Sequence, residues 1–126
     1  MDLKKEVYFS MIPEFKESEE LIKYAQSHQL YKDLLLQLKK DFSLANLTID
    51  LPPDTDPEEL KYLLQKNIQF LIEEKFSDFL NLLYIVDLPE TTAGKITTLH
   101  EQNISVHYTF LILKRVWQKV WFRKQY

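Results

Sequence analysis

Apolar residues recur along the chain with the three-to-four-residue spacing of α-helices. The clearest case lies between residues 57 and 74, where polar residues such as Lys61, Gln65 and Glu73 occupy the opposite side. The apolar positions are Leu60, Leu64, Ile68, Leu71 and Ile72. Asp56 can accept hydrogen bonds from the first backbone amides, and Pro57 suits the first helical position. We therefore expect an amphipathic helix over about 57–74.

A second apolar run, "FLNLLYIVDLPE", follows this helix. Ser77 and Asp78 offer a helix cap before the run, and Pro89 closes it. A short, nearly all-apolar helix fits this segment, and so does one unbroken helix over about 57–87. Beyond it, Pro89 and Gly94 mark a loop, so we expect residues 86–99 to be irregular.

Residues 14–42 also carry a helical apolar pattern, with an interruption near Ser27 and Gln29. Two helices and one kinked helix fit this pattern equally well. Its apolar positions are Phe15, Leu21, Ile22, Tyr24, Ala25, Leu30, Leu34, Leu35 and Leu38.

The C-terminal stretch "LILKRVWQKVWFRKQY" places both tryptophans among five basic residues. On a helix, one apolar face would point into the core, with both tryptophans on it. That face comprises Val106, Phe110, Leu113, Trp117, Val120 and Trp121, widened by Ile112 and Val116. The basic residues fall mainly on the other side, where cations near a helix C-terminus interact favourably with the helix dipole.

The composition supports a helical protein. The chain of 126 residues has one glycine, which argues against sheets joined by tight turns, and 45% hydrophobic residues, which suffice for a core. We expect one all-α domain over residues 1–126, a bundle of four to five mainly antiparallel helices. The absence of cysteine, of a secretory signal and of a long apolar run favours a cytoplasmic protein with no membrane span.

Charge is distributed unevenly along the chain. The last 13 residues carry five basic and no acidic side chains, whereas the preceding 113 carry 11 basic and 19 acidic ones, a net charge of −8. A mostly acidic surface disfavours broad contact with polyanions, so an anion would have to bind at the C-terminal end.

The outer side of the C-terminal helix is the candidate contact surface. There an aromatic ring, Phe122, projects among cations, a position with no evident role in the core. We call the surface the C-terminal edge and define it as Leu111, Arg115, Gln118, Lys119, Phe122 and Arg123. Packing of Phe122 within its own chain is the structural alternative.

Catalytic and metal-binding signals are weak. His100 and His107 lie about 10.5 Å apart on a helix, which is too far for both to bind one ion. A phosphate-binding loop needs several glycines, and Gly94 is the single one. We therefore assign no catalytic, cofactor-binding or metal-binding residue and expect no enzyme.

The segments "LLYIVDLPE" and "LILKRVWQKVWFR" resemble a group of small helical bacterial proteins of unknown function. The resemblance implies a helical fold and a bacterial source, and it implies no chemistry. Our functional hypothesis is therefore a non-enzymatic interaction or adaptor protein, whose C-terminal edge contacts another protein or a second copy of the chain. The alternative hypothesis is an accessory protein that binds nucleic acid through the basic C-terminal helix.

Overall fold

The computed structural model describes residues 13–88 and 101–125 of the chain, and within these ranges all regular structure is helical. This confirms the expected all-α bundle. The five helices are α2 (Ser18–Ser27), α3 (Tyr31–Leu44), α4 (Pro57–Glu74), α5 (Phe76–Val86) and α6 (Glu101–Gln125). Most of the segment 86–99, and His100, lie outside the described residues.

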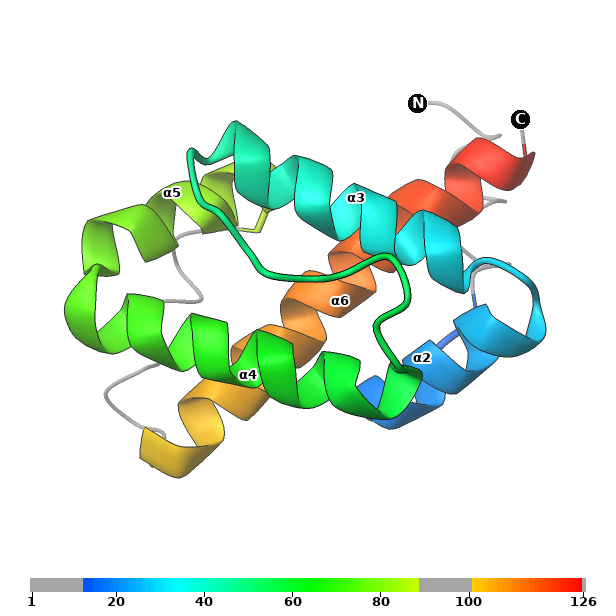
Figure 1. Cartoon of the computed structure of the whole chain (residues 1–126), viewed down its shortest axis with the longest axis horizontal. Coiled ribbons are helices and arrows are strands. Elements are labelled where there is room, and N and C mark those ends of the chain that lie inside the picture. Colours follow the sequence, from blue (N-terminus) through cyan, green and yellow to red (C-terminus); the bar gives the residue numbers. More distant parts are fainter. Residues whose placement is uncertain (1–12, 89–100, 126) are drawn as a thin grey trace, which may run out of the picture.

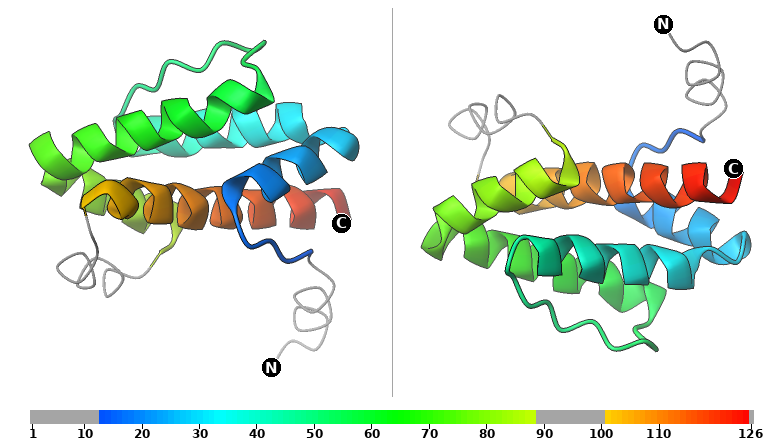
Figure 2. Two further views of the ribbon diagram at one scale, coloured as in Figure 1. Left: turned by 90° about the horizontal axis from the view of Figure 1, so that it is seen from below. Right: turned by 90° about the horizontal axis from the view of Figure 1, so that it is seen from above.

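Helix α6 is the centre of the arrangement. It contacts each of the other four helices, and it runs diagonally behind α3 and α4 (Figure 1). The two further views show α6 on one side of the layer that α3 and α4 form (Figure 2). The buried apolar side chains of all five helices therefore join into one core cluster.

The sequence left open whether residues 14–42 and residues 57–87 each form one helix or two. In both segments the structure has two helices. Residues 14–42 form α2 and α3, separated by His28, Gln29 and Leu30. The run 57–86 forms α4 and α5, separated by Lys75, whose non-helical backbone (φ −142°, ψ 60°) interrupts the helix. The sequence placed the start of α5 wrongly at Ser77 and Asp78, because the backbone break lies at Lys75 and the helix already begins at Phe76.

The predicted start of α4 is confirmed. The Asp56 carboxylate accepts a hydrogen bond from the backbone N–H of Glu58 at 3.0 Å, and Pro57 occupies the first helical position. Lys61 of the same helix forms an ion pair with Glu19 of α2. The hydrogen bond within this ion pair lowers the pKa of the Glu19 carboxyl and raises the pKa of Lys61.

Three helices end in the same way without using glycine. In each case a residue with positive φ is followed by a leucine whose N–H bonds to the carbonyl five residues earlier, at 2.8–2.9 Å, as in a Schellman motif. The pairs are Gln29–Leu30 after α2, Asn46–Leu47 after α3 and Asp87–Leu88 after α5. Because each leucine also belongs to or packs against the core, the motif both ends the helix and anchors the chain that follows it.

Residues 45–56 cross the front of the molecule between α3 and α4 (Figure 1). The segment is held down by Ile49 and Leu51, which are buried in the core, and by Tyr31 of α3. The Tyr31 hydroxyl donates to the carbonyl of Thr55 at 2.6 Å, and burial raises the pKa of Tyr31 to about 12.

The predicted core face of α6 is correct in its C-terminal half and wrong at Val106, which is 46% exposed. Phe110 and Trp121 are half-buried, and Trp117 is fully buried against Tyr24 of α2, with ring centroids 5.7 Å apart. The buried residues instead follow two rows with a spacing of four. These are Ile104, Tyr108, Ile112, Val116 and Val120, and Ser105, Thr109, Leu113 and Trp117.

A row spaced by four residues rotates about 40° around a helix at every step. Over the length of α6 the buried surface therefore turns by about 160°, as a helix with neighbours on several sides requires. A single fixed face, as assumed from the sequence, cannot describe it.

Candidate functional site

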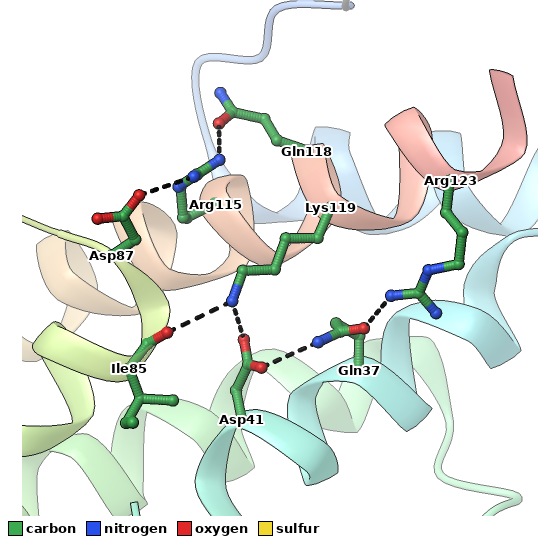
Figure 3. Close-up of polar contacts among 8 residues, drawn as sticks. All are labelled: Gln37, Asp41, Ile85, Asp87, Arg115, Gln118, Lys119 and Arg123. Carbon is green, nitrogen blue, oxygen red and sulfur yellow. Dashed lines mark hydrogen bonds and ion pairs between the residues drawn. The ribbon is translucent and has the colours of Figure 1, made fainter. Parts of the chain in front are cut away.

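The C-terminal edge lies beside the buried rows of α6. Leu111, Arg115, Lys119 and Arg123 form a third row with a spacing of four, which passes alongside α5 and α3. Leu111 is half-buried and packs against the core. The cations of this row point toward the neighbouring helices (Figure 3).

Arg115 binds the end of α5. Its guanidinium donates to the Asp87 carboxylate at 3.0 Å and to the Gln118 side-chain oxygen at 3.1 Å. Asp87 is the positive-φ residue that ends α5, and its side chain is 78% exposed. Gln118 is thereby engaged within α6 and orients the arginine.

Lys119 neutralises a buried carboxylate. Its ammonium group lies 2.8 Å from Asp41 of α3, whose side chain is 2% exposed, and 3.5 Å from the carbonyl of Ile85. Gln37, one turn before Asp41, donates its amide to the same carboxylate at 2.9 Å. A buried carboxylate without such partners would be strongly destabilising, so Lys119 has a structural role.

The pairing continues toward the C-terminus. Arg123 donates to the side-chain oxygen of Gln37, and Lys124 lies 3.4 Å from Asp33. The partners thus follow one another in reverse order along the two helices, as antiparallel neighbours require. We call this set the polar seam: Asp33, Gln37 and Asp41 of α3 with Lys124, Arg123 and Lys119 of α6.

The seam and the Arg115–Asp87 pair engage four of the five C-terminal cations. Three of them are in ion pairs with carboxylates, so the local positive charge is largely compensated. Lys114, the fifth cation, is exposed and lies outside this row. Phe122, whose exposure the sequence left open, is half-buried.

The structure therefore brings together the polar members of the C-terminal edge, but with partners that the sequence did not identify. Asp33, Gln37 and Asp41 were missed, although their spacing of four marks one polar row on an otherwise apolar side of α3. That polar row was the sequence signal for a polar contact on α3. The sequence did not show that α6 is the helix that contacts it.

Within residues 13–88 and 101–125, no three His, Asp or Glu side chains are grouped so as to hold a metal ion. Among the described helices, none combines the length and apolar character needed to cross a membrane.

Comparisons with protein-family models, with curated proteins and with solved structures found no match to this chain.

Proposed function

We propose that this chain is a non-enzymatic interaction or adaptor protein of the cytoplasm, and that the C-terminal edge of α6 contacts a protein partner or a second copy of the chain. The observation that carries the proposal is the internal pairing of the edge. Asp41 and Asp87 already neutralise Lys119 and Arg115.

This pairing favours a protein over a nucleic acid as the partner. To bind phosphates, Lys119 would have to leave a buried carboxylate uncompensated, which is costly. A protein contact requires no such exchange. The pairs fix the backbone and side chains around Phe122 and Leu111, and a surface that is already ordered loses little entropy on binding.

The experiment combines a binding titration with a comparison of variants. Fluorescent RNA and DNA are titrated at low and physiological salt, because phosphate contacts lose affinity steeply as salt rises. We expect no salt-sensitive binding. Tight binding at low salt that disappears at physiological salt would contradict the proposal and support the nucleic-acid hypothesis.

In parallel, Phe122→Ser is compared with the parent protein by pull-down from the native organism and by sedimentation. We expect the variant to lose a partner or self-association while its stability changes by no more than about 1 kcal/mol. Lys114→Ser, which alters an exposed cation of the same helix, is the control. Retention of every partner by the Phe122 variant would contradict the assignment of this surface.

A further inference from the structure

A second surface, on the opposite side of the core from α6, has the properties of a binding face. We propose that the outer face of α4 binds a basic, amphipathic segment of a partner protein. This inference goes beyond the function proposed for the C-terminal edge, because it concerns another helix and specifies the chemistry of the partner. The α4 outer face is defined by Glu58, Glu59, Tyr62, Phe70, Glu73 and Glu74.

Two aromatic rings on this face are exposed to solvent. Tyr62 is 65% exposed and Phe70 is 51% exposed. They are eight residues apart, which is about 12 Å along the helix and about 80° around it, so both lie on its outer half. Large rings contribute most to interfaces when a partner covers them, so two exposed rings on the outer half of one helix are a feature of a contact surface.

Each ring also borders a hollow in the surface. Tyr62 lines a hollow of about 360 Å³ between α4 and α2, together with Ile22 and Gln26. Phe70 lines one of about 340 Å³ beside Leu47 and Thr48. Side chains of a bound segment could therefore enter on both sides of α4.

The charge of the face defines the partner. All four glutamates are exposed, and none of them belongs to an ion pair in the described part of the chain. Lys66 lies between the rings, so the face carries a net charge of −3. A basic segment complements this charge, and like charges would exclude an acidic one.

Glu73 and Glu74 lie where the fold does not favour their negative charge. The Glu73 side chain accepts one hydrogen bond, from the uncharged Gln69 side chain of the same helix at 2.5 Å, and this contact leaves its charge uncompensated. Glu73 and Glu74 occupy the last turn of α4, where the helix dipole disfavours negative charge, and no basic residue balances them in that turn. Glu58 and Glu59 differ, because the dipole favours acidic residues in the first turn. The two C-terminal glutamates are therefore better explained by a partner than by stability.

One contact within the chain shows that the face can accept a cation. The ammonium group of Lys61 lies 4.8 Å from the centre of the Tyr62 ring. Lysine or arginine side chains of a bound segment could make the same cation–π contact with Phe70 or with the free side of Tyr62. A second copy of this chain is a poorer occupant, since three of its C-terminal cations are already in ion pairs.

The test uses two labelled amphipathic peptides, one of Lys and Leu and one in which Glu replaces every Lys. Fluorescence anisotropy at physiological ionic strength should show the basic peptide binding at least about tenfold more tightly than the acidic one. The double variant Tyr62→Ser, Phe70→Ser should weaken that binding at least about tenfold, a loss usual for central aromatic anchors. The control is Tyr84→Ser, a ring of α5 that is 74% exposed and should leave affinity within about twofold.

A second variant separates binding from folding. Glu73→Gln, Glu74→Gln should weaken the basic peptide at least about threefold while the unfolding midpoint stays equal or rises, because the change removes charge that the dipole disfavours. Phe122→Ser should bind the peptide normally, so failure of this inference is distinct from failure of the proposed function.

Three results would overturn the inference. The first is equal affinity for the two peptides, and the second is unchanged binding by the Tyr62, Phe70 double variant. The third is self-association of the unliganded protein, seen by sedimentation, that this double variant abolishes, since a second copy would then cover the face.

Discussion

Replacing Lys119 by Met tests the polar seam directly. The variant keeps most of the apolar length of the side chain but leaves Asp41, 2% exposed, with Gln37 as its remaining side-chain donor. Loss of one partner from a fully buried ion pair costs about 3–5 kcal/mol. Because a quarter of the Lys119 side chain reaches solvent, water can enter partly, and we expect a cost of about 2 kcal/mol.

The reverse change should be milder. Asp41→Leu leaves a lysine that can extend its ammonium group into water, so we expect a loss of about 1 kcal/mol. The double variant should be close to the parent protein, because an apolar pair can replace a buried ion pair at little cost. The stability loss of the double variant should thus be smaller than the sum of the two single losses by at least about 1 kcal/mol.

Urea denaturation measures all four proteins of this cycle. With a slope of about 2 kcal/mol per molar urea, Lys119→Met should lower the midpoint by about 1 M. Lys114→Met is the matched control, an exposed cation of the same helix whose loss should change stability by no more than about 0.5 kcal/mol. If Lys119→Met unfolds at the same urea concentration as Lys114→Met, the polar seam does not stabilise the fold. Lys119 is then again a candidate for binding a partner.

Two further changes should stabilise the protein. At Gln29 the left-handed backbone costs a non-glycine residue about 1–2 kcal/mol. Gln29→Gly keeps this conformation without the steric cost, so the melting temperature should rise by about 3 °C, whereas Gln26→Gly, within α2, should lower it. Equal effects at both glutamines would contradict the backbone argument. Thr109→Val replaces a fully buried hydroxyl that has no hydrogen-bond partner in the described structure, so stability should rise by about 1 kcal/mol, and a loss in the melt would show that the hydroxyl is satisfied.

The sequence predicts α4 well because its signals are local. Asp56 and Pro57 mark the start, and one apolar face suffices because the helix lies at the surface of the bundle. The break at Lys75 was open because neither proline nor glycine marks it. The positive-φ backbone at Gln29, Asn46 and Asp87 was not recognised, since glycine is the usual residue at such positions and this chain does without it there.

Helix α6 shows where local reasoning fails. Val106 was placed in the core because a fixed helical face was assumed, whereas the position of four neighbouring helices decides which side is covered at each turn. The same limit applies to the C-terminal edge. Arg115 and Lys119 could be recognised as one polar side of a helix, but Asp41 lies 78 residues from Lys119, and only the tertiary register brings them together. The resemblance to small bacterial proteins stays a prediction.

The central position of α6 has a consequence for synthesis of the protein. Helices α2 to α5 leave the ribosome first, yet each of them packs against α6, which follows them all among the described helices. At about 5–20 residues per second, roughly 4–17 s separate the synthesis of α2 from that of α6. During that interval the nascent chain carries apolar helix surface that α6 does not yet cover, and folding should finish only after translation has passed α6.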